Sequence, residues 1–229
     1  MKHTKFSNNS LRQIDQYFDD YISAQKIAGC SLLLWQSEAE RYTMFKGVQD
    51  LESGTPVSRD TIFRIYSMTK PVASVALMML WDRGYFDLND PIARFLPKFN
   101  EMTLYRPDGD HVSAAGQIKM QHVLNHTAGF ILPAFSEHPL REFYVSDGVN
   151  GSRSEGTLTD VIDRLANKPL LFEPGTRWEY SMATDVVGHL IEVIDGRPFD
   201  TFLQEEIFAP LGLVDTGFHL SSNKISRFA

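Results

Sequence analysis

Apolar residues near the N-terminus repeat at the spacing of an amphipathic helix. Ser10 and Gln13 stand at capping-box spacing, in which the serine accepts from an early amide and the glutamine reaches back. Gly29 follows the repeat and closes it. The pattern therefore predicts a helix that begins near Ser10, with one apolar stripe formed by Leu11, Ile14, Tyr17, Phe18, Tyr21 and Ile22.

Two extended runs follow this helix. Residues 30–36 and 41–48 are rich in apolar and β-favouring side chains, and the polar residues 37–40 join them. Such a pattern is typical of a half-buried β-hairpin. We therefore expect two antiparallel strands early in the chain.

A second helix is predicted from Ser67 to about Arg83. Pro71 falls in its first turn, where the missing N–H costs nothing because the first amides of a helix have no intrahelical partner. The predicted buried side consists of Val72, Val75, Ala76, Met79 and Leu80.

The rest of the chain is predicted to be helical in its later part. Residues 87–127 read mostly as loop, with one short amphipathic piece at 91–96, and residues 133–156 read as a surface excursion. Further helices are expected at 158–165, 182–194 and 199–208, with Gly196 as a C-cap. Strands first and helices later predict an α+β fold. Two strands alone form a marginal sheet, so either strands escape this reading or the rest of the sheet lies outside this chain.

Composition places the chain among globular proteins. It has 229 residues, of which 43% are hydrophobic and 22% charged. The net charge is −7 and no run of basic residues occurs, so a nucleic-acid partner is not expected. The single cysteine, Cys30, has no partner for an internal disulfide, which fits a reducing compartment.

The sequence gives no sign of membrane attachment. The first ten residues lack the apolar core of a signal peptide, and the longest strongly apolar run, Val72–Trp81, is far shorter than the ~20 residues that span a bilayer. We expect a cytoplasmic protein with no membrane partner.

Most familiar catalytic signatures are absent from the sequence. His122 and His126 stand at i and i+4, but the glutamate of a zinc protease and a convincing third ligand are missing. We therefore predict structural histidines, with His126 bonding backbone in the turn before Gly129, and neither a metal nor a cofactor. A Ser-His-Asp triad stays open, although nothing points to it.

The spacing Ser-x-x-Lys occurs three times, beginning at Ser23, Ser67 and Ser221. Ser23 lies at the end of the first helix and Ser221 in a polar tail. Only Ser67 stands where an extended apolar run meets a helix N-terminus. Context therefore selects Ser67 as the candidate nucleophile.

The chemistry of this position fits nucleophilic catalysis. Residues three apart lie on one helix face, so Lys70 can approach the Ser67 hydroxyl and act as a base if its pKa is lowered. The unpaired amides of a helix N-terminus favour an oxyanion. The alternative is a helix N-cap followed by a solvated lysine. A second fragment, Glu173–Ser181, reads as a turn that leads to Tyr180, and taken alone such a tyrosine is more often a packed aromatic whose hydroxyl finds a partner.

Four sequence blocks together resemble the serine β-lactamase and penicillin-binding-protein superfamily. The similarity extends from the first helix to the end of the chain, and it is greatest to the class C-like serine hydrolases, which include carboxylesterases with a β-lactamase fold. The blocks occur in the family's order, at 63–70, 124–129, 172–175 with 180–181, and 210–213 with 215–218.

This resemblance implies a two-step acyl transfer without a cofactor. Ser67 would attack an ester or amide carbonyl of a small molecule, and water would cleave the acyl-enzyme. Lys70 and Tyr180 would share the proton transfers, and the Ser67 N–H would be one oxyanion donor. Ser181 and Met182 would be substrate-binding residues. A methionine stands where lactam-cleaving members have an asparagine, which favours an ester substrate because a thioether donates no hydrogen bond.

The resemblance also implies an incomplete fold. The family's antiparallel sheet, flanked by helices and joined to a helical region, is built from both ends of its chain, and the third motif lies beyond Ala229. This chain would be the N-terminal portion of one domain: 1–66 in the sheet region, 67–209 mainly helical and 210–229 starting the return to the sheet. The C-terminal strands, one oxyanion donor and the closing helix would be missing, and a C-terminal fragment or second chain would complete the sheet.

Three functions remain open from the sequence. The first is a serine hydrolase that cleaves carboxylic esters. The second is a β-lactamase or D-Ala-D-Ala peptidase. The third is a catalytically inactive binding module of the same fold, or a fragment without activity of its own.

Overall fold

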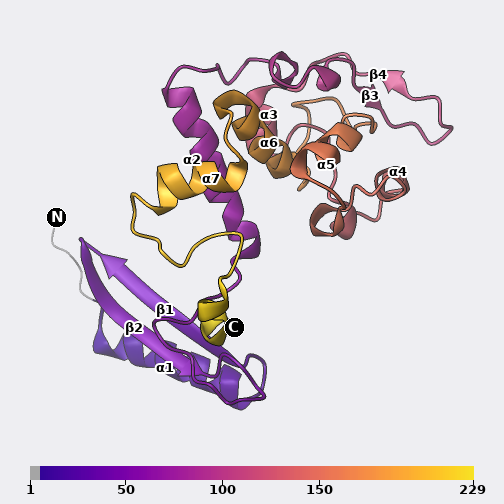
Figure 1. The fold of residues 1–229 in the computed structure, drawn as a ribbon. Coiled ribbons are helices and arrows are strands. Elements are labelled where there is room, and N and C mark those ends of the chain that lie inside the picture. The colour runs from indigo at the N-terminus through magenta and orange to yellow at the C-terminus, as the bar shows by residue number, and fades with distance from the viewer. Residues whose placement is uncertain (1–5) are drawn as a thin grey trace. The chain divides into compact units, whose positions relative to one another are not determined.

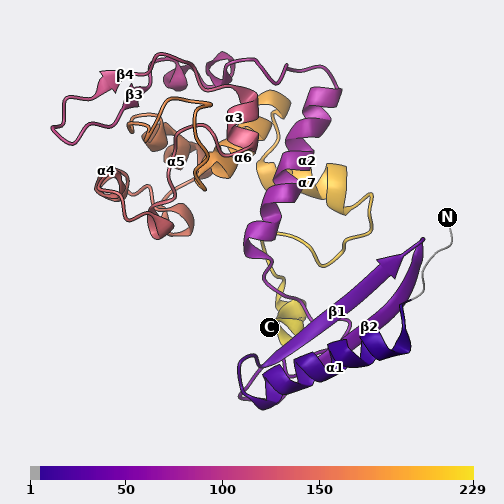
Figure 2. The same ribbon diagram turned by 180° about the vertical axis from the view of Figure 1, so that it is seen from behind.

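The computed structural model describes residues 6–229 and divides into two compact units. The first unit contains the described residues up to Ile65 together with Phe218–Ala229, and the second contains Tyr66–Gly217. Figures 1 and 2 show the hairpin with its helix in the first unit and the helical elements of the second. The α+β class expected from the sequence is confirmed.

Helix α1 spans Asn8–Ser23, and its N-cap is Ser7. The Ser10 N–H donates to Ser7 Oγ at 3.0 Å. The prediction of a cap at Ser10 was therefore wrong by one turn. Ser10 occupies the third helical position, because Ser7 already has the extended backbone and the side-chain oxygen that a cap requires.

The predicted hairpin is confirmed as β1, Gly29–Gln36, paired antiparallel with β2, Ala39–Gly47. Ser37 and Glu38 form the turn, and both have positive φ angles, as a two-residue hairpin turn requires. Helix α1 is tied to β2 through Lys46, whose Nζ lies 2.7 Å from Asp19 Oδ2. Figure 1 shows α1 lying along the hairpin, and this ion pair joins the two.

The last residues of the chain return to the first unit. The Ile62 N–H donates to the Arg227 carbonyl at 2.7 Å, and the Ala229 N–H donates to the Ile62 carbonyl at 3.0 Å. The Arg64 guanidinium lies 4.3 Å from the centroid of the Phe228 ring. The segment between the hairpin and Tyr66 is thus paired with the chain terminus.

The second unit is built on two packed helices. Helix α2 spans Thr69–Asp82 and packs against α6, Ala183–Asp195. The remaining helices of this unit are α3 (Met120–Leu124), α4 (Leu140–Val145), α5 (Leu158–Leu165) and α7 (Phe199–Leu203), which a π turn extends through Gln204–Phe208. The predictions for α5 and for the Gly196 C-cap, which has a φ of 91°, are confirmed.

The buried face of α2 differs from the prediction. Its fully buried residues are Ala73, Ala76, Leu77 and Leu80, whereas Val75 is 54% exposed. This helix is apolar on almost every side. The stripe of residues shifted by one position from the predicted one therefore has the same helical spacing and is equally able to be buried. Alanines on the buried side let a neighbouring helix approach closely.

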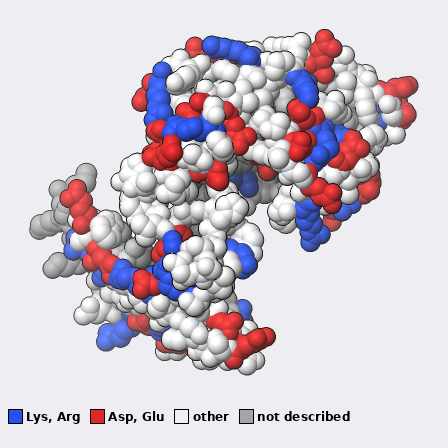
Figure 3. Space-filling view, viewed as in Figure 1, with Lys and Arg blue, Asp and Glu red and all other residues white. Residues whose placement is uncertain are grey.

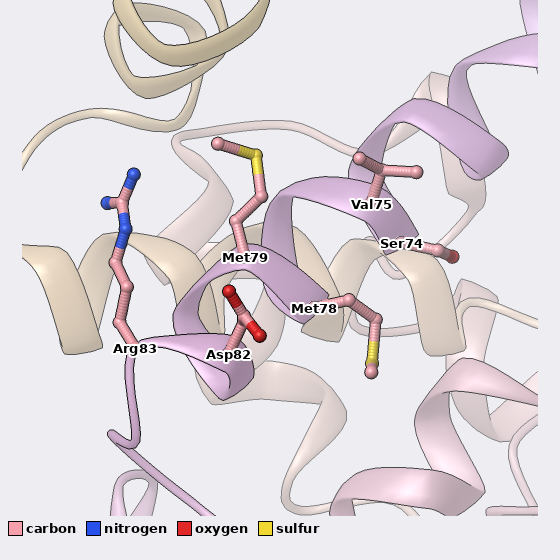
Figure 4. A pocket seen from close by; sticks show the side chains of 6 residues that line it. All are labelled: Ser74, Val75, Met78, Met79, Asp82 and Arg83. Atoms are coloured by element: carbon pink, nitrogen blue, oxygen red, sulfur yellow. The ribbon is translucent and has the colours of Figure 1, made fainter.

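The outward face of α2 carries a groove of about 480 Å³ (Figure 4). Figure 4 shows that its lining side chains all come from α2 and the residue that follows it. Val75, Met78 and Met79 supply the apolar part, and Asp82 and Arg83 lie at the C-terminal end. One apolar face of α2 is therefore buried in the second unit, and the other lines this groove.

Two segments that were predicted to lack regular secondary structure contain strands or a helix. Strands β3 (Thr103–Leu104) and β4 (Val112–Ser113) pair antiparallel, and each is too short to show an alternating pattern. The region 133–156 was wrongly predicted to be a surface excursion, since α4 lies within it and buries Leu140 and Tyr144. A helix of six residues is too short for a periodicity signal.

Backbone hydrogen bonds join residues 126–131 to residues 171–182. The carbonyl groups of His126, Thr127 and Gly129 accept from the N–H groups of Glu179, Gly175 and Leu171 at 3.0, 2.7 and 2.8 Å. The second and third blocks of the sequence comparison are therefore neighbours in space. Gly129, at a φ of 94°, sits so close to this partner that an added Cβ would lie 2.6 Å from the Phe172 carbonyl oxygen.

Charged side chains of both signs are interspersed on the face shown in Figure 3. Among the ion pairs of the second unit, Arg197 pairs with Glu205 at 2.6 Å and with Glu206 at 2.7 Å. Among residues 6–229 no helix combines the length and the apolar content that crossing a bilayer needs.

We predict that Gly129→Ala destabilises the protein more than Gly109→Ala does. Both glycines have positive φ angles, so both variants meet the left-handed penalty of about 1–2 kcal/mol. Gly109 has open space around it, whereas the new methyl group at Gly129 meets backbone. At about 2–4 °C per kcal/mol for a chain of this size, the melting temperature falls several degrees further for Gly129→Ala. An equal fall in melting temperature for the two variants would contradict the close approach of Gly129 to the Phe172 backbone.

Candidate active site

Ser67 lies in a one-turn 3₁₀ helix, Tyr66–Met68, that leads directly into α2. The predicted helix start is therefore correct in place, although the α-helical part begins at Thr69. Tyr66, immediately before the serine, has a φ of +42°. A tyrosine with this left-handed backbone conformation is strained by about 1–3 kcal/mol, and such strained residues cluster at functional sites. The Ser67 side chain is exposed.

The three predicted catalytic side chains meet at one point. Ser67 Oγ and the Tyr180 hydroxyl share a hydrogen bond of 2.7 Å. Lys70 Nζ donates to Ser67 Oγ at 3.4 Å and lies 4.8 Å from the centroid of the Tyr180 ring. A hydroxyl, an amine and a phenol from positions 113 residues apart in sequence are thus within reach of one reacting atom.

The electrostatics of the cluster favour an anion on Tyr180. Hydrogen bonding to Lys70 lowers the pKa of the Tyr180 phenol below its ordinary value of 10.0, and the hydrogen bond with Ser67 lowers it further. Burial and the charge of Asp185 oppose this shift. Burial raises the pKa of Asp185 itself, although the Lys70 ammonium acts in the other direction. Lys70 is therefore the charge that stabilises a phenolate.

Ser181 and Met182 lie inside the second unit. Ser181 is 2% exposed and Met182 is fully buried. The Met182 N–H donates to the Ile131 carbonyl at 3.3 Å, which extends the backbone contacts made by residues 126–129. Both residues thus help to anchor the Tyr180 segment, and their assignment as substrate contacts stays a prediction.

His126 lies beside the cluster, a position that the sequence reasoning did not anticipate. Its ring centroid is 5.2 Å from that of Tyr180, and its Nδ1 lies within hydrogen-bonding distance of the Ser181 backbone N–H. The only signal in the sequence was that His126 belongs to one of the four similar blocks. The other histidine of the pair, His122, accepts from the Lys119 N–H at 3.2 Å. In residues 6–229 no group of three or more His, Cys, Asp or Glu side chains is arranged to hold a metal ion.

Exposed aromatic rings flank Tyr180. The Phe135 and Trp178 ring centroids lie 6.3 and 6.5 Å from the Tyr180 ring, and these two side chains are 78% and 63% exposed. Large aromatic side chains are costly to leave in water unless they contact a partner or ligand. Two large apolar rings therefore lie beside the cluster.

The fold and the three converging side chains define a β-lactamase/transpeptidase-like protein. The chain belongs to the Beta-lactamase family, whose model matches residues 14–229. The fold expected from the sequence resemblance is thereby confirmed.

Individual relatives include an esterase and an acyl-group transferase. Esterase EstB of Burkholderia gladioli is 31% identical over 219 residues, which cover 95% of this chain and 53% of EstB. Monacolin J acid methylbutanoyltransferase of Aspergillus terreus is 32% identical over 170 residues, which cover 72% of this chain and 40% of that protein. The solved structure of EstCE1, described as a hydrolase with promiscuous acyltransferase activity, superimposes with a TM-score of 0.81 at 30% identity, over 96% of this chain and 55% of EstCE1. The chain spans about half the length of the relatives it matches.

We predict that Lys70→Met raises the pKa of Tyr180 back toward its ordinary value. Loss of the ammonium removes the group that most strongly favours the phenolate. The measurement is a pH titration of ¹³Cζ-labelled tyrosine by NMR, with the Tyr180 signal assigned from Tyr180→Phe. Lys98→Met, which removes an exposed ion pair with Asp163, is the matched control and leaves the titration unchanged. An unchanged Tyr180 titration in Lys70→Met would contradict the effect of Lys70 on the Tyr180 pKa.

Proposed function

We propose that this protein is a serine hydrolase that cleaves carboxylic esters through an acyl-enzyme. The observation that carries the proposal is the 2.7 Å hydrogen bond between Ser67 and Tyr180 next to Lys70. Its membership of the Beta-lactamase family and its similarity to EstB support the same reaction class. Within that family we assign it to the class C-like branch, with Ser67–Lys70 as its Ser-x-x-Lys motif.

The geometry supports Tyr180 as the base. A Tyr180 phenolate, stabilised by the Lys70 ammonium, takes the Ser67 proton while Ser67 Oγ bonds to the carbonyl carbon. The resulting oxyanion accepts from the Ser67 backbone N–H. When the tetrahedral intermediate collapses, Tyr180 returns the proton to the departing alkoxide, which leaves as an alcohol.

Deacylation repeats the sequence with water. Tyr180 takes a proton from the attacking water, whose oxygen bonds to the acyl carbon. Collapse of this second intermediate releases the carboxylic acid and returns the proton to Ser67 Oγ. The enzyme thus ends each turnover in its starting protonation state.

The apolar surroundings support an ester with an apolar acyl or alkyl part. Phe135 and Trp178 present rings beside Tyr180. β-Lactam or D-Ala-D-Ala peptide cleavage is therefore the second candidate.

We predict that Ser67→Ala abolishes labelling by a fluorophosphonate and hydrolysis of a p-nitrophenyl ester. Removal of the nucleophile removes the acyl-enzyme. Ser221→Ala, which changes an equivalent Ser-x-x-Lys serine in an exposed stretch, is the matched control and leaves both unchanged. The complete protein is assayed with the ester and with nitrocefin. Turnover of nitrocefin alone would favour the second candidate, and absence of labelling at Ser67 would favour a binding module.

We predict that Tyr180→Phe lowers kcat by about 10²–10⁴ with little change in KM, because proton transfer acts in the transition state. The phenylalanine keeps the ring and removes only the hydroxyl. In the native protein kcat/KM rises with pH as Tyr180 ionises, along a limb that lies below pH 10 because Lys70 lowers the pKa. Steady-state kinetics across pH measure both effects. An unchanged kcat would exclude Tyr180 as the base.

A further inference from the structure

His126 occupies the junction between residues 126–131 and the segment that carries Tyr180. Its carbonyl accepts from the Glu179 N–H at 3.0 Å, and its φ of +60° is left-handed, a region that few non-glycine residues adopt. On the side-chain end, Nδ1 lies 3.4 Å from the Ser181 backbone nitrogen and 3.3 Å from Ser181 Oγ. Both ends of this residue therefore hold the chain on either side of Tyr180.

The contact with Ser181 requires an uncharged imidazole. A backbone N–H only donates, so Nδ1 must present its lone pair and the ring proton must be on Nε2. Protonation of Nδ1 turns an acceptor into a donor. The nearly buried Ser181 N–H then faces another N–H and loses this partner.

The charges around the ring favour the uncharged form. Burial lowers the pKa of His126, and the Lys70 ammonium on α2 lowers it further. Tyr180 faces the ring from the segment before α6, at a centroid distance of 5.2 Å. Asp185 lies in the first turn of α6. Its charge raises the Tyr180 pKa, and the Lys70 ammonium lowers the pKa of Asp185 itself. Lys70 thus disfavours a second cation at the site.

We propose that His126, as an uncharged hydrogen-bond acceptor, is a positioning residue that holds the Tyr180 hydroxyl against Ser67, and that protonation of His126 releases this hold. The proposal rests on the esterase function proposed above, and it adds an acid-sensitive element to it. His126 touches neither Ser67 nor the reacting carbonyl in this role, because it acts through the backbone of Ser181 and the ring of Tyr180.

The direction of the pH effect follows from linkage. The folded protein holds the pKa of His126 below the ordinary value of 6.5, so the unfolded chain binds the proton more readily. The native arrangement is undisturbed at and above neutral pH. It weakens as pH falls below 6.5 and His126 is forced to accept a proton. The expected consequence is an acid limb of kcat that is separate from the ionisation of Tyr180.

Two substitutions separate the acceptor from the ring. His126→Asn places a carbonyl oxygen near the position of Nδ1, tolerates the left-handed backbone and does not titrate. His126→Phe keeps a ring beside Tyr180 and removes the acceptor. His122→Asn is the matched control, since His122 is a half-buried histidine of the same region that caps the Lys119 N–H instead.

Steady-state ester hydrolysis from pH 5 to 10 tests the proposal in the complete protein. His126→Phe lowers kcat by about 10- to 100-fold at pH 8, with KM changed less than about 3-fold, and its difference from the native protein narrows toward pH 5. His126→Asn keeps at least about a third of the native kcat at pH 8 and loses the separate acid limb. His122→Asn retains the native profile. An acid limb that survives His126→Asn, or a native kcat in His126→Phe, overturns the proposal.

NMR provides a readout that needs no turnover. In ¹⁵N-histidine spectra, we expect His126 as the Nε2–H tautomer with a titration midpoint below 6.5. In ¹³Cζ-tyrosine spectra, His126→Phe shifts the Tyr180 titration upward, because the phenol moves away from Lys70 and Ser67, whereas His122→Asn does not. An unshifted Tyr180 titration overturns the positioning role. Absence of Ser67 labelling in the native protein, with the NMR results as expected, would instead reject only the esterase function.

Discussion

The site depends on the packing of α2 against α6. Ser67 stands two residues before α2 and Tyr180 three residues before α6, so the approach of these helices sets the distance between the two hydroxyl groups. The buried faces of both helices include small residues, among them Ala73, Ala76 and Ala183. Small side chains at a helix contact allow the axes to approach closely. A core made for close packing therefore also brings the proposed nucleophile and its proposed base together.

The same packing places the N-terminal ends of two helices beside one cluster. The N-terminal end of an α-helix carries the positive pole of the helix dipole, equivalent to roughly half an elementary charge. Lys70 adds a full charge, and its effect on the Tyr180 pKa is the largest of those acting on that group. An anion, either the Tyr180 phenolate or the oxyanion of an intermediate, is therefore the natural occupant of the site.

Local features of this architecture could be predicted from the sequence, whereas contacts between distant segments could not. The spacing of Ser67 and Lys70 predicts that both side chains lie on one helix face. The turn residues of the hairpin and Gly196 after α6 likewise indicate where the backbone reverses or a helix ends. Tyr180 has no such signal. Its meeting with Ser67 follows from the α2–α6 contact, and only the resemblance of four sequence blocks pointed to it.

The errors have the same origin. The buried face of α2 was predicted one residue out of register because Val75 and Met79 belong to an outward stripe that is as apolar as the inward one. Short elements such as β3 and α4 are too brief to produce a period. In both cases the partner segment decides which residues are buried, and a single sequence does not identify that partner.

Charge balance connects the proposed base to the histidine beside it. With Lys70 positively charged, ionisation of Tyr180 brings this pair to neutrality, while a proton on His126 adds a second positive charge within the same cluster. Because Lys70 lowers the pKa of both neighbours, it favours the phenolate of Tyr180 and the uncharged imidazole of His126 together. These are the two forms that the proposed mechanism needs: a phenolate to accept the Ser67 proton, and an imidazole to accept the Ser181 N–H that we propose keeps the phenol in place. One ammonium group therefore shifts both equilibria in the direction that the proposed mechanism requires.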